Sequence, residues 1–363
     1  MPAHRNAPAS ARRAAGPRQW LAWRLCLALA LLLALPALSE PIEPPLQQLF
    51  ASSNSLVVTR LRSVDARGQL VFEVQKVLSG SKPQTESLAF TVSRQLSATL
   101  ESGKRYVLAY SILRPDPRNR LRQIANPRAP VLLRTPGLDP ALLPDSHLLR
   151  AILHEARELV GEDEQDEDGN RHPSRELTDL LLKALNQGEP QLQNLAANQL
   201  ALDPEIAGEL SATQKSRLGQ MVEDAGNSPL ARSALLQAAF RYPGRYGQWW
   251  PEAARTILAK APISGYGDKN ADLDGLAMVS FSVLQGSEVE LPAGVLERWI
   301  PCENPALAER ALLMLRKQAP AREAKAVEAA LADSSLPPRT RQFLQGYQRR
   351  QKLLQERRER ARE

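Results

Sequence analysis

The sequence predicts an α+β protein in which a small antiparallel β-barrel is followed by an all-α domain of helical repeats. Between residues 46 and 140, short runs of apolar and polar residues alternate with the period of two that is typical of strands. Beyond residue 172, apolar residues recur with helical spacing, and short breaks that contain Pro or Gly separate the helical segments. The predicted parts are a targeting segment (1–39), the barrel (46–140), a helix with an acidic linker (141–172), the repeats (173–347) and a charged tail (348–363).

The composition excludes several classes of protein. A hydrophobic fraction of 43% and a charged fraction of 24% are ordinary for a globular chain, and they exclude a collagen, a wholly disordered chain and a polytopic membrane protein. The net charge of +7 comes from the two ends, because residues 40–338 hold 33 basic and 37 acidic side chains. A nucleic-acid-binding protein usually spreads its positive charge over one face of the fold. We therefore predict no nucleic-acid partner.

The first 39 residues have the order of a secretory signal peptide. Residues 1–24 contain five arginines and no acidic residue, and an apolar run follows over 25–38. This run ends in small residues at Ser39. The run is shorter than the roughly 20 residues that span a bilayer, so we expect cleavage near Ser39, a periplasmic or secreted protein, and no transmembrane segment afterwards. A retained anchor helix is the alternative. Cleavage leaves Cys302 as the last cysteine, and its apolar context predicts a buried, inert thiol.

The barrel is predicted from short strands. In the clearest of them, Leu70, Phe72 and Val74 alternate with Glu73 and Gln75. Five or six such strands in about 90 residues favour a barrel or sandwich that closes on itself and leaves no exposed edge. The alternation also places Phe72 and Phe90 in the core, which argues against an aromatic face for nucleic acid. The expected strands are 56–64, 70–78, 88–92 and 106–113, with weaker candidates at 121–124 and 131–134.

Three segments of this region resemble a known protein family. Residues 57–61, 71–80 and 100–108, with a strand that ends in a Leu-Ser-Gly turn and a Gly-Lys-Arg-Tyr strand entry, resemble exported bacterial domains of the netrin-like fold. This is the OB-type barrel that tissue inhibitors of metalloproteinases also contain. The resemblance implies a barrel and a bacterial envelope location. It does not imply protease inhibition, because the N-terminal cysteine that those inhibitors place on the protease zinc is missing here.

The helical part carries a weak internal repeat. Three predicted helices begin alike at Pro190, Pro229 and Pro305, with spacings of 39 and 76 residues, and the second spacing is close to twice the first. A period near 40 residues with two helices per unit indicates a helical array, and the runs at Arg232 and Arg310 resemble the second helix of HEAT-like repeats. An irregular helical domain is the alternative. The expected helices are 146–160, 175–187, 190–201, 214–225, 229–240, 248–260, 272–285, 293–300, 304–318, 321–333 and 338–354.

Two motifs could hold a metal ion, and we predict that neither does. His154 and Glu158 resemble the zinc motif His-Glu-x-x-His with a carboxylate in the last place, but helical spacing puts both on the solvent side, which favours an ordinary charged face. Asn270–Asp274 matches the first half of a calcium loop, but Phe281 stands where a bidentate Glu is needed, so a helix cap is favoured. We predict no catalytic, cofactor or metal residue.

The densest aromatic cluster supplies the candidate binding residues. The candidates for a partner-binding anchor are Trp249, Trp250 and Tyr246, with Phe240 and Tyr242 nearby in the sequence, and packing between helices is the alternative. We expect an exported, non-enzymatic protein-interaction module that binds an unknown protein through its helical array, since such arrays present extended surfaces. The alternatives are a metal-dependent hydrolase built on His154 and Glu158, and binding of a polyanion or membrane surface by the basic tail 348–363.

Overall fold

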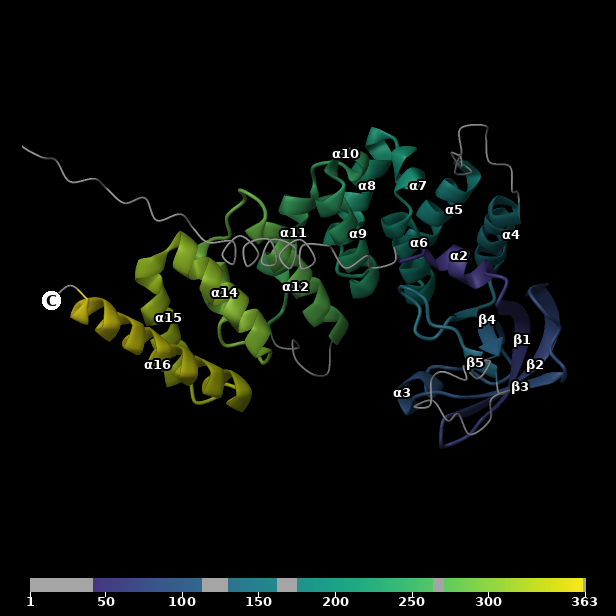
Figure 1. Ribbon diagram of the computed structural model, residues 1–363, viewed down its shortest axis with the longest axis horizontal. Helices are drawn as coiled ribbons and strands as arrows, with labels where there is room; N and C mark the ends of the chain where they lie inside the picture. The colour runs from purple at the N-terminus through teal and green to yellow at the C-terminus, as the bar shows by residue number, and fades with distance from the viewer. Residues whose placement is uncertain (1–41, 113–129, 162–174, 264–270, 362–363) are drawn as a thin grey trace, which may run out of the picture. The chain divides into compact units, whose positions relative to one another are not determined.

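The protein is a mixed α+β chain in which an antiparallel sheet precedes a long series of helices (Figure 1). The predicted signal segment 1–39, the weak strand 121–124 and most of the predicted acidic linker lie outside the described residues. The fold class predicted from the sequence is confirmed. The computed structural model describes residues 42–112, 130–161, 175–263 and 271–361.

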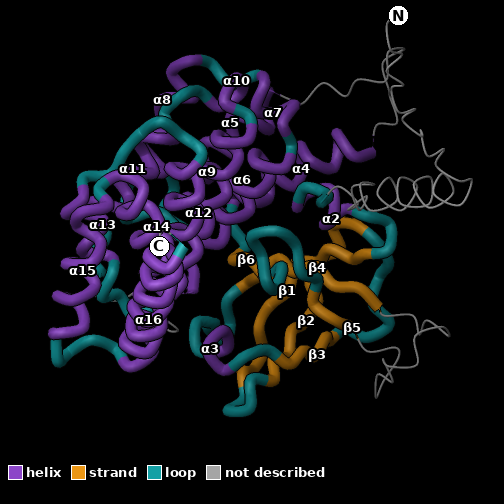
Figure 2. The backbone as a smooth tube through the Cα atoms, turned by 60° about the vertical axis from the view of Figure 1, so that its left-hand side comes forward, coloured by secondary structure: helices purple, strands orange, loops and turns teal. Residues whose placement is uncertain are grey.

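The six strands of the sheet curl into a nearly closed barrel (Figure 2). The strand order is β3-β2-β1-β4-β5, with β6 also paired to β4, and every pairing is antiparallel. The two edge strands β3 and β5 contact each other, which brings the ends of the sheet together. The strands are β1 (Asn54–Val64), β2 (Gln69–Ser79), β3 (Ser87–Thr91), β4 (Arg105–Ile112), β5 (Pro130–Leu132) and β6 (Leu142–Pro144).

The central strand β1 is buried on both faces. Val57 and Leu61 point into the barrel, where they pack with Phe72 and Tyr110. Successive side chains of a strand point to opposite faces, so the intervening residues face outwards. In β1 those residues include Val58, which is fully buried in a second core that continues into the helices. The outer side of β1 is therefore covered from Asn54 to Thr59, whereas Arg60 and the outward residues of β3 meet solvent as in an ordinary half-exposed sheet.

A short helix packs against this side of β1. The short helix α2 (Pro45–Phe50) contacts β1, α4 (His147–Gly161) and α6 (Pro190–Leu202). Its first turn is fixed by a buried hydrogen bond from the Leu46 backbone N–H to Gln199 Oε1 in α6, at 2.9 Å. The barrel and the first helices thus share one core, and a buried amide of α6 satisfies a backbone donor that α2 would otherwise leave unpaired.

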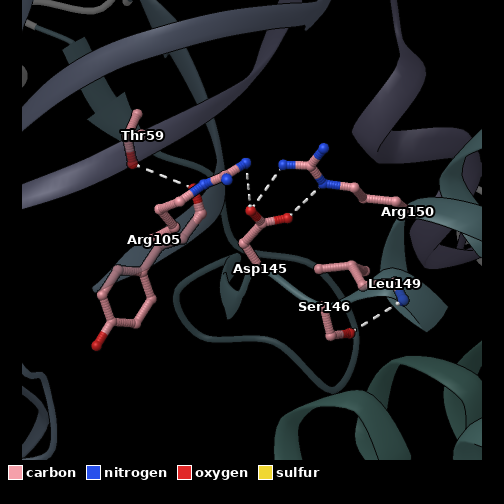
Figure 3. Close-up of polar contacts among 7 residues, drawn as sticks. Thr59, Arg105, Asp145, Ser146, Leu149 and Arg150 are labelled. Atoms are coloured by element: carbon pink, nitrogen blue, oxygen red, sulfur yellow. Dashed lines mark hydrogen bonds and ion pairs between the residues drawn. The ribbon is translucent and has the colours of Figure 1, made fainter.

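The chain between the barrel and α4 is clamped by a carboxylate (Figure 3). The side chain of Asp145 is almost completely buried. Its Oδ2 forms an ion pair with Nη2 of Arg105, from β4, at 2.8 Å. The carboxylate also accepts hydrogen bonds from Nε and Nη2 of Arg150, in α4, at 2.6 and 2.7 Å. Ser146 caps α4 by accepting the Leu149 backbone N–H at 3.1 Å. A single carboxylate therefore joins a strand of the barrel to the first long helix, through paired charge-assisted hydrogen bonds.

The helices that follow begin near the residues expected from the sequence, several with Pro in the first turn, where its missing N–H has no cost. Four short helices were not expected from the sequence, namely α2, α3 (Arg94–Ser97), α7 (Pro204–Gly208) and α10 (Pro243–Tyr246). The others are α5 (Arg175–Leu185), α6, α8 (Ala212–Glu223), α9 (Pro229–Arg241), α11 (Trp250–Lys260), α12 (Ala271–Gln285), α13 (Ala293–Trp299), α14 (Pro305–Gln318), α15 (Pro320–Ala332) and α16 (Pro338–Arg360).

These helices form repeated pairs in two layers. One layer consists of α6, α9, α12, α14 and α16, and each of these contacts the next. The other helix of each pair, namely α5, α8, α11, α13 and α15, packs against its own partner in that layer. The three helices with similar starts in the sequence, α6, α9 and α14, all belong to the first layer, with α12 in the place between α9 and α14 (Figure 1). The predicted helical repeats are confirmed at this level.

A polar link recurs within the pairs, buried in two of them and partly buried in the third. In three of them, the side chain three residues after the initial proline of the first-layer helix donates a hydrogen bond to a carbonyl near the end of the preceding helix. The orphan carbonyls at a helix end need such donors. Arg310 is not equivalent to Arg232, because it lies five residues after its proline, is partly exposed and contacts Gln285 instead. The links are Gln193 to Leu185 (3.1 Å), Arg232 to Val222 (2.7 Å) and Arg341 to Leu331 (2.9 Å).

Two boundaries differ from the sequence pattern. The sheet continues past residue 140, because β6 pairs with β4. The last helix, α16, runs to Arg360 and so takes in most of the tail that the sequence set apart at 348–363. Among the described helices, none combines the length and the apolar character needed to cross a bilayer.

Candidate interaction surface

The aromatic cluster predicted as a partner-binding anchor is divided between interior and surface. Tyr246, at the end of α10, is completely buried, and its hydroxyl donates to the Leu200 backbone carbonyl in α6. Burial raises the pKa of this phenol well above its usual value. Tyr246 therefore contributes to packing between helices, and its ring has no face open to solvent.

Trp249 is half-buried and fills a space that a glycine leaves open. Its indole Nε1 donates to the Tyr246 carbonyl at 2.7 Å. The ring lies against Gly219 in α8, where a Cβ atom would stand 2.8 Å from the Trp249 Cγ. The close approach of the indole to the backbone of α8 thus requires glycine in the middle of that helix, despite its low helix propensity.

This contact yields a prediction with a matched control. Gly219→Ala adds a methyl group that must displace Trp249, whereas Gly275→Ala adds one in open space within α12. Both substitutions gain the same helix propensity, so their difference isolates the overpacking. We expect Gly219→Ala to be less stable than Gly275→Ala by about 1–3 kcal/mol in urea unfolding. Equal stabilities would contradict the packing of Trp249 on α8.

The exposed part of the cluster is formed by Phe240 and Trp250. Their rings meet edge to face with centroids 5.2 Å apart. Phe240, near the end of α9, is 39% exposed, and Trp250 is half-buried at the start of α11. The Phe240 ring also lies against Gly286, directly after α12, where a Cβ would stand 2.8 Å from Cζ. The aromatic surface of α9 therefore continues onto the end of α12.

A cavity of about 410 Å³ opens next to this point, between the end of α12 and α14. Its apolar lining includes Leu284, Val289 and Leu313, and Leu313 is 42% exposed. Glu288 and Glu290 line it as well. We name Phe240, Trp250, Gly286, Leu313 and this cavity the α9–α14 patch. Phe240 and Leu313 are bulky apolar side chains in a region of the fold where neighbouring helices bury most others.

The sequence singled out Phe240 only as a neighbour of the tryptophans and did not identify Leu313. Phe240 follows a helical run of alanines and leucines, most of which are buried. Leu313 lies in the run Leu312-Leu313-Met314-Leu315, whose other members are buried. A continuous apolar run does not reveal which residue faces outwards, because helical periodicity is lost in it.

The residues of the suspected zinc motif do lie together. One ligand atom each from His154, Glu155 and Glu158 falls within 4.8 Å of the others, and His154 Nε2 is 3.5 Å from Glu158 Oε1. The side chains of His154 and Glu158 are 70% and 59% exposed, so water surrounds them. This agrees with the predicted position on the solvent side of α4, where an i,i+4 pair of this kind contributes a few tenths of a kcal/mol, about 0.2–0.5.

The suspected calcium loop falls at the start of α12. Residues 264–270 lie outside the described part of the chain, which resumes at Ala271. Within the described part, Asp274 Oδ2 accepts a hydrogen bond from Nδ2 of Asn304 at 2.8 Å, and Asn304 in turn caps α14 by accepting the Ala306 backbone N–H. Asp274 thus connects the start of α12 to the start of α14.

Cys302 has the buried position expected from its sequence context. Its thiol is 1% exposed and donates to the Asn304 carbonyl at 3.2 Å. Burial raises the pKa of the thiol to about 12. Since the thiolate is the nucleophile, this cysteine stays protonated and inert at neutral pH.

The sequence did not indicate a polar cluster near the C-terminal end of the array. Arg316 in α14 holds Glu323 of α15 through two bonds of 2.9 and 3.0 Å, and both contact the Tyr347 hydroxyl of α16. Desolvation opposes the charge of Glu323, but the hydrogen bonds from Arg316 and Tyr347 outweigh it and lower the pKa of the carboxyl group. The three residues fasten the last three helices to one another. Their separation in the sequence is why no local pattern revealed them.

The aromatic rings of the barrel lie inside it, as predicted for Phe72 and Phe90. Phe72 meets Phe90 and Tyr106 edge to face at 6.1 Å, and all three are buried with Tyr110. These rings pack the barrel and have no exposed face on which a base could stack. A cavity of about 620 Å³ lies where β3 approaches β5, and it is lined by Phe90, Leu132, Arg134 and Asp139 among others.

Comparisons with known families, proteins and structures found no match to this chain. No protein-family model matches the chain, and neither a curated protein nor a solved structure matches it significantly. The site is therefore interpreted from its own residues alone.

Proposed function

We propose that this protein is an exported, non-enzymatic interaction module that binds another protein through the α9–α14 patch. Export is supported by the basic, apolar and small-residue order of residues 1–39. Binding through the array is supported by its repeated helix pairs, since stacked pairs present extended surfaces. The observation that carries the proposal is the continuity of exposed Phe240 with the cavity beside Leu313.

The chemistry of the patch indicates the occupant. An aromatic ring next to a cavity of about 410 Å³ with a mixed apolar and polar lining fits a protein segment that inserts a bulky apolar side chain. Glu288 and Glu290 line the cavity together with Lys317, so its lining has a net negative charge. This favours a basic residue beside the inserted group, because charge complementarity selects partners and speeds association. We therefore propose an apolar–basic peptide segment of a partner protein as the ligand of the patch.

The barrel supports a finer structural proposal. We assign it to the netrin-like class of OB-type barrels on the strength of its antiparallel order and two of its turns. Gly80, directly after β2, has a φ of 80° and lies so close to Asn54 that a Cβ would meet its carbonyl oxygen at 2.2 Å. Gly103, before β4, also has a positive φ, of 84°. Both glycines belong to the segments that carry the sequence resemblance. In this proposal the barrel supports the array structurally.

Site-specific photo-crosslinking tests the binding proposal. Phe240 and Leu313 are replaced one at a time by p-benzoylphenylalanine in the full chain, and Val131 on the barrel, exposed to 41%, serves as the matched control. We expect one defined crosslinked protein from both patch positions and none from Val131. We also expect Leu313→Asp to abolish the product formed from position 240. Absence of a product at both patch positions, or the same product from Val131, would overturn the proposal.

A further inference from the structure

The end of α16 carries an unusual combination of exposed side chains. The first part of the helix is anchored, because Thr340, Leu344 and Tyr347 are buried against its neighbours. From Lys352 to Arg360, every residue is exposed except Glu356, which is partly buried. Leu353 and Leu354 are 57% and 47% exposed, among the largest values for apolar side chains in the described residues. The helix thus continues beyond its packed part and presents two leucines to solvent.

Helical geometry places arginines around these leucines. Successive residues turn by about 100°, so Arg350 and Arg357 lie between Leu353 and Leu354 on the helix surface. Three further arginines, Arg349, Arg358 and Arg360, lie within about 90° of the line between the leucines. Glu356 lies about 110° from that line and pairs with Arg360 Nη2 at 3.8 Å, which offsets one of the five positive charges. The same geometry puts Glu359 and Lys352 on the opposite side. We call the side with the two leucines and five arginines the α16 face.

The charge and the leucines together select the partner. A soluble polyanion needs only the arginines, and a second copy of the α16 face would bring like charges together. An anionic bilayer surface uses both components, because arginines attract the acidic headgroups and leucines enter the boundary of the acyl chains. We propose that the α16 face binds the surface of a membrane that contains anionic phospholipid, and so holds the exported protein against that membrane. This binding is separate from that of the α9–α14 patch.

Vesicle binding tests the proposal on the full chain. The probes are vesicles of phosphatidylcholine alone and vesicles with equal amounts of phosphatidylcholine and phosphatidylglycerol, at low and high salt. Residues 1–39 carry five arginines and an apolar run and would themselves adsorb to anionic lipid. The quantity scored is therefore the difference between the native chain and each variant in the binding that depends on phosphatidylglycerol and falls with salt. We expect this binding to be weakened about fivefold or more by Arg357→Glu, and less than about twofold by Lys352→Glu, which makes the same change of charge on the other side.

The leucines distinguish a bilayer from a soluble polyanion. We expect Leu353→Ser combined with Leu354→Ser to weaken vesicle binding about tenfold, since two partly inserted apolar side chains are lost, while binding to heparin is unchanged. If the double leucine variant binds vesicles as well as the native chain does, the face recognises charge alone and the proposal is wrong. Equal effects of Arg357→Glu and Lys352→Glu, or no phosphatidylglycerol-dependent binding, would overturn it as well.

Discussion

Trp299→Ala is expected to destabilise the protein by about 3–5 kcal/mol, the cost of truncating a large buried aromatic side chain. Trp299, at the end of α13, is completely buried. Its ring meets Phe281 of α12 edge to face at 5.5 Å, and its Nε1 donates to the Leu258 carbonyl of α11 at 2.9 Å. One side chain therefore connects three helices. Its removal leaves a cavity and takes one of two donors from the Leu258 carbonyl, which keeps Arg298 Nη2 at 3.1 Å.

Chemical unfolding separates the two components of this loss. Trp299→Phe keeps a ring against Phe281 but removes one donor to the Leu258 carbonyl, which Arg298 still contacts. We therefore expect it to lose less than Trp299→Ala, with about 0.5–1.5 kcal/mol from the lost hydrogen bond. Leu313→Ala is the control, because the side chain is 42% exposed and we expect a loss below about 1 kcal/mol. If Trp299→Ala costs no more than Leu313→Ala, the ring does not connect the helices as described.

The second large effect is expected at Arg232. This arginine is only 6% exposed, and its Nε donates to the Val222 carbonyl at 2.7 Å near the end of α8. Arg232→Met keeps most of the apolar stem but removes the donor, and we expect a loss of about 2–3 kcal/mol. Arg232→Lys should restore little, because a compact ammonium group does not reproduce the planar donor geometry of the guanidinium.

Arg310 provides the matched control, since both arginines precede a similar Ala/Leu run in the sequence. Arg310 is partly exposed, and its Nη1 donates to Gln285 Oε1 at 3.0 Å on the surface. We expect Arg310→Met to change the free energy of unfolding by less than about 0.5 kcal/mol. Equal losses at the two positions would contradict the difference in burial between them.

Local patterns predicted most of the regular elements. The strong alternation of Leu70, Phe72 and Val74 marked β2 because a strand with one side in a core must alternate. Prolines at 190, 229 and 305 marked three helix starts because Pro is compatible with the first turn and not with the helix interior. These signals depend only on neighbouring residues, and they could be found without knowledge of the tertiary fold.

Features that depend on distant partners could not be predicted in this way. The strand β6 has only three residues, and its pairing with β4 defines it more than its composition does. The side chain of Asp145 receives Arg105 and Arg150 from two different elements, and nothing in its neighbourhood reveals the convergence. In the same way, the division of the aromatic cluster into buried Tyr246 and exposed Phe240 depends on where α6 and α12 pack.

The burial of β1 on its outer side, through residues such as Val58, constrains how this protein can change in evolution. Transfer of the barrel alone to another gene would expose this apolar surface to water. Loss of the barrel would in turn expose the apolar residues of α2 and α4 in the same core. The barrel and the helices are therefore expected to be inherited together, unless polar residues replace the apolar ones between them when they separate.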